Sequence, residues 1–167
     1  KLQLELVPYA SRSFSSFNNK EKIKELCPYV ETLFEEIFSQ EREYVIFCSR
    51  LFKEVFEVYN KNKQWHEGNE VYHKQWCVEF GDEYKCTIKD NKVNKKGDIE
   101  VKELSVSCQP ITIKRNNGES IKAIIANTFP SQALPNAYKK MAEYGKFCYQ
   151  VYNGLNNNLI PKEIWIK

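Results

Sequence analysis

The sequence predicts an α/β fold: a mostly parallel central sheet flanked by helices, with a β-hairpin insertion. Short apolar runs typical of buried strands alternate with amphipathic segments of helical periodicity, both before residue 60 and after residue 120. Between them, residues 60–114 show short alternating segments separated by turn signals. The length of 167 residues fits one domain that buries its own core. We therefore expect a single domain over 1–167, with 60–114 as a hairpin-rich insertion.

The first sixty residues predict a strand–helix–strand–helix order. Leu2–Val7 alternates and then becomes apolar, which indicates a strand. Lys20–Ser39 has helical spacing, and Pro28 is expected either to break this helix or to begin a second one. Tyr44–Cys48 is wholly apolar, as in a buried parallel strand, and Leu51–Tyr59 places its apolar residues on one helical face.

The remaining elements are predicted mainly from turn signals. Gly81-Asp82 indicates a hairpin between the short strands on either side, and the polar run Lys89–Asp98 predicts an exposed loop. Asn116-Asn117-Gly118 predicts a second hairpin, which leads into an apolar strand at Ile121–Ala126. Pro135–Tyr152 is an amphipathic helix. The strands 2–7, 44–48 and 121–126 are expected to share the central sheet.

Composition and charge exclude several classes of protein. The net charge is +3, and residues 111–167 hold eight Lys or Arg against three Asp or Glu. None of the six cysteines forms a Cys-x-x-Cys pair, which predicts free thiols in a reducing, cytoplasmic setting. No apolar stretch has the length of a membrane span, so no membrane partner is expected. Because the chain has no initiator Met and opens within an apolar strand, we expect a fragment that lacks its first strand.

Few residues suit a metal or a standard catalytic triad. His66, His73, Cys77 and Cys86 lie near one another in sequence, but their spacing matches no compact zinc motif. Surface histidines and strand cysteines explain them as well, so we predict no metal. There is no Gly-rich phosphate loop and no Gly-x-Ser-x-Gly motif, and no cofactor is expected.

The segment Ala123–Gln132 is the most informative one. An apolar strand ends in a Pro-Ser loop that precedes a helix, and ligands of open α/β sheets bind at the carboxyl ends of strands. The Ser131 hydroxyl and nearby backbone N–H groups are suited to a phosphate. The alternative is an ordinary strand-to-helix turn.

Four short motifs together resemble the later two-thirds of the uracil-DNA glycosylase superfamily. In chain order they are Leu6-Val7-Pro8, Cys27-Pro28-Tyr29-Val30, the strand 44–48 with Ser49-Arg50, and Phe129-Pro130-Ser131. The resemblance covers most of the chain outside residues 60–110. It implies a domain that flips a nucleotide out of DNA into a pocket at the strand ends.

The departures from this family bear on chemistry. Glu5 stands where the family has a base-reading Asn, and Phe129 where it has the His of a His-Pro-Ser loop. The resemblance places the general base upstream of Lys1, and the cysteines match no iron–sulfur set. An ionised Glu5 only accepts hydrogen bonds, which favours a base with an exocyclic amino group, such as cytosine. A surface ion pair explains Glu5 as well.

The resemblance therefore implies a DNA glycosylase-like domain that binds double- or single-stranded DNA and a flipped cytosine-type base, modified or not. The residues expected to bind the base are Glu5, Pro8, Tyr9 and Phe129. Those expected to contact DNA are Lys122, Ser131, Gln132, Leu134, Lys139 and Lys140. One alternative is a non-catalytic domain of the same fold that binds nucleic acid or a nucleotide. A second is a protein-interaction domain of a phage or defence system.

Overall fold

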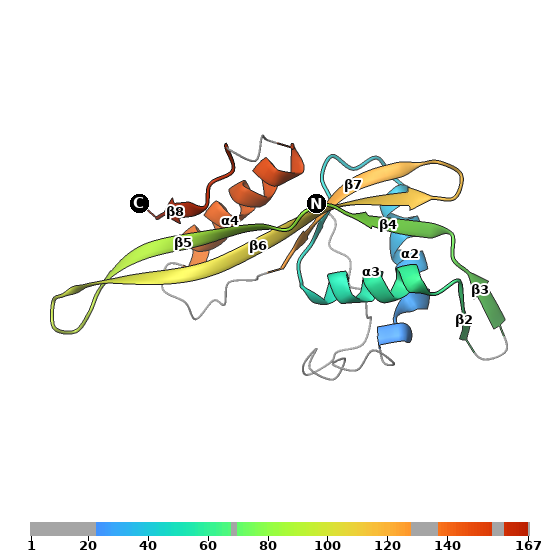
Figure 1. Cartoon of the computed structure of the whole chain (residues 1–167), viewed down its shortest axis with the longest axis horizontal. Helices are drawn as coiled ribbons and strands as arrows, with labels where there is room; N and C mark the ends of the chain where they lie inside the picture. The colour runs from blue at the N-terminus through green and yellow to red at the C-terminus, as the bar shows by residue number, and fades with distance from the viewer. Residues whose placement is uncertain (1–22, 68–69, 128–136, 155–158, 167) are drawn as a thin grey trace. The chain divides into compact units, whose positions relative to one another are not determined.

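The computed structural model describes residues 23–67, 70–127, 137–154 and 159–166. Its helices are α2 (Cys27–Phe38), α3 (Leu51–Lys61) and α4 (Ala137–Tyr152) (Figure 1). Its larger sheet holds β1 (Ile46–Phe47), β4 (Trp76–Phe80), β5 (Tyr84–Val93), β6 (Ile99–Arg115), β7 (Ser120–Ala126) and β8 (Glu163–Trp165). A separate two-stranded sheet pairs β2 (Gln64–Glu67) with β3 (Glu70–His73).

The larger sheet is mixed, with the strand order β1-β7-β6-β5-β8 and β4 also paired to β6. β1 is parallel to β7 and β5 is parallel to β8, whereas β5 and β6 are antiparallel over ten residue pairs. The predicted mostly parallel sheet flanked by helices is therefore wrong. The reason is the short turn at residues 94–98, because so short a connection joins antiparallel strands only. The predicted strand at 2–7 lies outside the described residues.

The chain divides into two compact units. Unit 1 takes its residues from 1–45, 51–79 and 112–121, and unit 2 from 46–50, 80–111 and 122–167. The strands β6 and β7 contribute residues to both units. The segment 60–114, predicted as an insertion within one domain, is accordingly shared between the two units.

The core of unit 1 is aromatic. Phe34 of α2 lies with its ring centroid 5.3 Å from Phe56 and 5.9 Å from Tyr59, both on α3, and 5.8 Å from Trp76 of β4. Large aromatic side chains bury much apolar area, which holds the two helices together. Pro28 lies in the first turn of α2. Backbone N–H groups in this turn have no acceptor within the helix, so a proline costs no helical hydrogen bond there.

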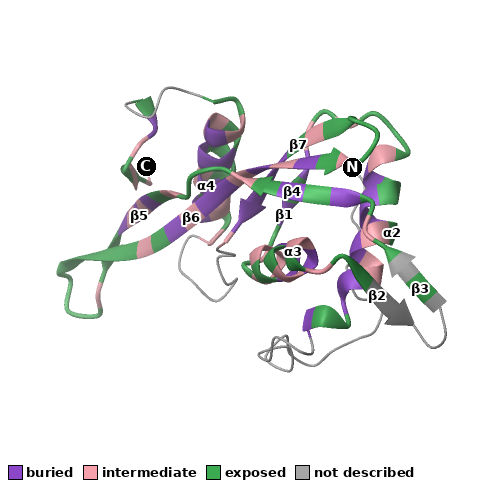
Figure 2. Cartoon of the chain, turned by 45° about the vertical axis from the view of Figure 1, so that its right-hand side comes forward, coloured by how far each residue is buried: buried purple, intermediate pink, exposed green. Residues whose placement is uncertain are grey.

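The core of unit 2 lies between the sheet and one face of α4. Its helical members are spaced as one stripe at Tyr144, Phe147, Cys148 and Val151. They pack against alternate strand residues, namely Cys86 and Ile88 of β5, Val106 and Cys108 of β6, and Ile124 and Ala126 of β7. Figure 2 shows these strand centres buried, whereas the far end of the β5–β6 hairpin is exposed.

Of the predicted turns and loops, one is confirmed and two are wrong. Asn116–Gly118 is the turn between β6 and β7, with Gly118 at a φ of 96°, as predicted. Gly81-Asp82 is not a hairpin turn, because β4 and β5 both pair with β6 instead of with each other. Lys89–Asp98 is not a loop throughout, since β5 continues to Val93 before the chain turns. Polar residues at its outer end hide this strand from any test of apolar periodicity.

The helices also bear on the membrane prediction. Among the described residues, none of the helices combines the length and the apolar character that crossing a bilayer requires.

Candidate nucleic-acid interface

The parallel pair β1 and β7 brings two strand ends to one edge of the sheet in unit 2. Ile46 pairs with Ile124 and Phe47 with Ile125, so both strands end on the same side. Ser49-Arg50 follows β1, and Asn127 follows β7 directly. In α/β sheets, ligands bind beyond the carboxyl ends of parallel strands, so this edge is a candidate ligand site.

A cluster of three polar side chains lies at this edge, and we call it the strand-end cluster: Glu83, Ser107 and Asn127. Ser107 Oγ donates to Glu83 Oε1 at 3.0 Å, and Asn127 Nδ2 donates to the same oxygen at 2.9 Å. Asn127 Nδ2 also lies 3.3 Å from Ser107 Oγ. One carboxylate oxygen therefore orients both a hydroxyl and an amide.

The backbone fixes the strand-end cluster from two directions. The Asn127 N–H donates to the Ser107 carbonyl at 3.0 Å, which extends the β6–β7 pairing past the end of β7. The Tyr144 hydroxyl of α4 donates to the same carbonyl at 2.5 Å. Because that carbonyl accepts from both a strand end and the helix, the position of Ser107 is tightly defined.

Two amide oxygens of unit 2 have no hydrogen-bond donor in the described part of the chain. Asn127 Oδ1 and Gln109 Oε1 are both buried, and neither has a partner among the described residues. The Gln109 amide nitrogen does have one, since it donates to the Gly81 carbonyl at 2.8 Å. Buried polar atoms are almost always paired in folded proteins, so an unpaired acceptor within a polar cluster points to a missing donor.

A hollow of about 620 Å³ adjoins the cluster and shares Ser107 with it. The antiparallel register places Lys85 opposite Ser107, and Thr87 opposite Ser105, on this open side of β5 and β6. Lys162 completes the polar lining. Two ammonium groups and three hydroxyls form a donor-rich surface, which suits an anion such as a phosphate. Neither Lys85 nor Lys162 has an ion pair among the described residues.

The structure places only some of the residues that the sequence predicted for the site. Lys122 and Lys139 are exposed, as a contact with DNA requires. Most of the others lie outside the described residues: Glu5, Pro8, Tyr9, Phe129, Ser131, Gln132 and Leu134.

Lys140 does not fit the predicted contact with DNA. Its side chain is 2 % exposed, and its Nζ lies 3.5 Å from a carboxylate oxygen of Asp90 on β5. The physical reason is helical spacing, since Lys140 falls four residues before Tyr144 and eight before Cys148, on the buried stripe of α4. The apolar pattern of the helix already indicates that Lys140 lies on its buried face, although the sequence prediction did not use this spacing.

The sequence prediction missed all three members of the strand-end cluster. Asn127 carries a signal that sequence reasoning can use, because it is the first polar residue after a wholly buried strand. Glu83 and Ser107 carry none, since only the pairing of β6 with both β5 and β7 brings them to that strand end.

The described cysteine and histidine side chains form no metal centre. Among the described residues, no three His, Cys, Asp or Glu side chains converge in a way that holds a metal ion. The thiols of Cys108 and Cys148 are hydrogen-bonded within the core of unit 2, and the hydrogen bond and the burial together raise the pKa of the Cys108 thiol. Burial, with a smaller effect from Glu163, raises the pKa of Cys86 to about 11. The raised pKa values of Cys86 and Cys108 keep these two thiols protonated at neutral pH, which makes them poor nucleophiles.

Comparison with known protein families, characterised proteins and solved structures found no match to this chain. The function of this chain must therefore be inferred from the chemistry of the site itself.

Proposed function

We propose that this chain binds DNA through unit 2 and holds a nucleotide base at the carboxyl end of β7, as a DNA glycosylase-like protein does. The observation that carries the proposal is the contact between the strand-end cluster and the donor-rich hollow, which share Ser107. A base and its phosphate need these two surfaces side by side: one to form hydrogen bonds with a base edge, and one to attract negative charge.

The division of charge between the units supports a polyanionic partner. Unit 2 holds thirteen Lys or Arg against eight Asp or Glu, a net charge of +5, whereas unit 1 has twelve against fourteen, a net charge of −2. Phosphate binding is driven largely by the release of counterions, so a net positive surface favours nucleic acid. The excess of positive charge therefore lies in the unit that contains the hollow.

The strand-end cluster favours a base that presents an amino group. Asn127 Oδ1 and the Glu83 carboxylate are hydrogen-bond acceptors, and Asn127 Oδ1 has no donor among the described residues. Cytosine and adenine present an exocyclic amino group, whereas uracil presents a carbonyl at the same position. The base-reading role that the resemblance gives Glu5 would add a further acceptor with the same preference.

Cleavage of the N-glycosidic bond is the second candidate function. The observation in its favour is the parallel pair β1 and β7, whose carboxyl ends precede Ser49-Arg50 and the Phe129-Pro130-Ser131 segment. We assign no catalytic residue among the described ones. Binding without catalysis and a protein-interaction domain remain the competing functions, and the assays below separate them. The buried thiols suit a reducing compartment such as the cytoplasm.

The test is DNA binding by fluorescence anisotropy at low salt. We expect the wild type to bind a fluorescent single-stranded oligonucleotide, with an affinity that falls as salt rises. Lys85→Glu/Lys162→Glu should abolish this binding. The matched control is Lys61→Glu/Lys63→Glu, which makes the same charge change on exposed residues of unit 1 and should retain it.

Two results would overturn the proposal: no binding by the wild type at low salt, or equal losses in both double variants. For the second candidate, alkaline cleavage of the product strand reports base release from cytosine-, modified cytosine- and uracil-containing duplexes. Release from any of them assigns an enzymatic activity, and binding without release shows that residues 1–167 alone bind DNA without cleaving it.

A further inference from the structure

The β5–β6 hairpin continues beyond the part of the sheet that α4 covers. We call its outer end the arm, residues 91–102. None of these residues is buried, whereas Asp90, immediately before them, is 3 % exposed. Within unit 2, Figure 1 shows this end of the hairpin running past both α4 and β8. The described residues of unit 2 therefore leave the whole arm unburied.

The turn at the tip of the arm is well defined. Asn94 Oδ1 accepts the N–H groups of Lys96 and Asp98 at 2.8 and 3.0 Å, and the Asn94 N–H donates to the Asp98 carbonyl. Gly97 supplies the positive φ, 89°, that closes the turn. The arm is a preformed two-stranded ribbon, so holding its shape in a complex costs little conformational entropy.

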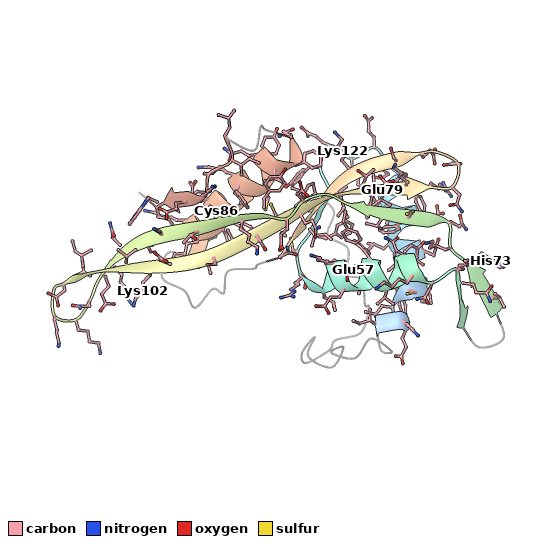
Figure 3. The ribbon with its side chains drawn as sticks, in the orientation of Figure 1. Glu57, His73, Glu79, Cys86, Lys102 and Lys122 are labelled. Atoms are coloured by element: carbon pink, nitrogen blue, oxygen red, sulfur yellow. The ribbon has the colours of Figure 1, made fainter. Side chains whose placement is uncertain are left out.

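The two faces of the arm differ in chemistry. Val93 pairs with Ile99 and Asn91 with Val101, so three apolar side chains lie on one face, and they are 64, 71 and 48 % exposed. On the other face, Lys92 lies opposite Glu100 in the strand register, and Lys102 is their neighbour. Figure 3 shows the Lys102 side chain extending away from the ribbon.

The acidic side chains of the arm have partners within it, and they are fewer than its lysines. Glu100 accepts from Lys102 at 2.9 Å and from Asn94 at 3.1 Å, and Asp98 also accepts from Asn94. Lys92, Lys95 and Lys96 form no side-chain hydrogen bond or close ion pair with the described residues. Residues 91–102 hold four lysines against two acids, a net charge of +2.

We propose that the arm lies in a groove of double-stranded DNA, with its lysines on the phosphates and its apolar face toward the bases. A two-stranded β-ribbon fits the major groove, which is about 12 Å wide and 8.5 Å deep. The three residues from Asn91 to Val93 with their turn extend the ribbon by roughly 10–13 Å, enough to reach the groove floor. Apolar side chains on such a ribbon contact thymine methyl groups or base steps.

This inference rests on the proposed function, and it adds a preference for duplex over single-stranded DNA to that function. A flexible single strand offers no groove, so only the strand-end cluster and the hollow should act on it. The arm and the hollow therefore predict different losses on the two kinds of DNA.

The experiment measures binding of the full chain to a single-stranded oligonucleotide and to the matching duplex across a salt series. We expect Lys92→Gln/Lys95→Gln/Lys96→Gln to weaken duplex binding about tenfold or more and to reduce the slope of log K against log salt by roughly 2–3. Single-strand binding should stay within about twofold. The matched control is Lys53→Gln/Lys61→Gln/Lys63→Gln in unit 1, which should leave both affinities unchanged.

A second variant tests the apolar face without altering charge. Val93→Ser/Ile99→Ser should weaken duplex binding and spare single-strand binding. If the arm variants bind duplex like the wild type while Lys85→Glu/Lys162→Glu still loses binding, the arm proposal is wrong and the proposed function stands. If Val93→Ser/Ile99→Ser instead dissolves a self-association of the wild type in analytical ultracentrifugation and leaves duplex binding intact, the arm is a protein contact and the proposal is overturned.

Discussion

Asn127 Nδ2 donates to Glu83 Oε1 over 2.9 Å, although the two residues are 44 positions apart in the chain. The bond ties the end of β7 to the residue that precedes β5, within unit 2. Glu83 also accepts from Ser107, so the amide and the hydroxyl are held in one orientation before any ligand arrives. Preorganised polar groups of this kind favour binding because less side-chain freedom is lost on association.

The Asn127–Glu83 bond predicts a specific rescue. Asn127→Asp places a second carboxylate beside that of Glu83, and the repulsion should lower the free energy of unfolding by about 1–2 kcal/mol. Glu83→Gln in the same chain restores a donor and should recover most of this loss. Urea unfolding of the two single variants and the double variant measures the coupling, and additive effects would show that the two side chains do not interact.

Lys139 and Lys140 are adjacent in α4 yet should behave in opposite ways. Lys139 is exposed, so Lys139→Gln should weaken DNA binding modestly and leave stability unchanged. Lys140 is buried against Asp90, and Lys140→Met leaves a buried carboxylate without this cation, which should cost about 3–5 kcal/mol of stability. Chemical denaturation and anisotropy measured on both variants test this. A stable Lys140→Met variant that fails to bind DNA would reverse the assignment.

The Tyr59 hydroxyl predicts a pH dependence of stability in unit 1. It donates to the Glu31 carboxylate and accepts from the backbone N–H of Trp76 at 3.3 Å. Burial, and then the hydrogen bond to the Glu31 carboxylate, raise the pKa of Tyr59 above its usual value near 10. The folded state thus disfavours the phenolate, and the stability present below about pH 10 is lost as pH rises beyond it, by up to about 1.4 kcal/mol per pH unit.

Tyr59→Phe isolates this effect from the other tyrosines. The variant should be less stable than the wild type by about 1–3 kcal/mol at neutral pH, because it leaves buried partners unsatisfied. Above pH 10 its stability should fall less steeply than that of the wild type. Thermal unfolding from pH 7 to 11 measures both curves, and parallel curves over that range would show that Tyr59 is not the group responsible.

The cysteines predict a simple labelling pattern. Cys48 and Cys77 are exposed, whereas the other four are buried. A brief reaction of the native protein with a maleimide should add two labels, and the same reaction in denaturant should add six. Cys77→Ser should remove one native label. Four or more native labels, detected by mass spectrometry, would mean that the buried thiols are accessible.

Much of the helical structure could be predicted from periodicity alone. The apolar stripes at 20–39, 51–59 and 135–152 mark where α2, α3 and α4 lie, because each helix buries one face. The parallel pairing of β1 with β7 also follows from two short apolar runs. The outer half of β5 could not be predicted, since the buried Asp90 is paired with Lys140, which lies fifty residues later in the chain.

The candidate site, too, depends on contacts between distant residues that the sequence does not reveal. Asn127 is visible in the sequence as the polar end of a buried strand, but Glu83 joins it only through the folded sheet. Gly81-Asp82 has the composition of a hairpin turn, yet β6 is long enough to pair with the strands on both sides of it. Local turn signals cannot reveal the length of a distant partner strand.

The most direct test of the central claim is an NMR titration of the ¹⁵N-labelled chain with a short single-stranded oligonucleotide containing cytosine. Binding in unit 2 predicts that the largest amide shifts occur at Lys85, Thr87, Ser105, Ser107 and Asn127, and that they diminish as salt is added. Amides of α2 and α3 should move little. Shifts confined to α2 and α3, or no shifts at millimolar oligonucleotide and low salt, would contradict the claim that unit 2 binds DNA.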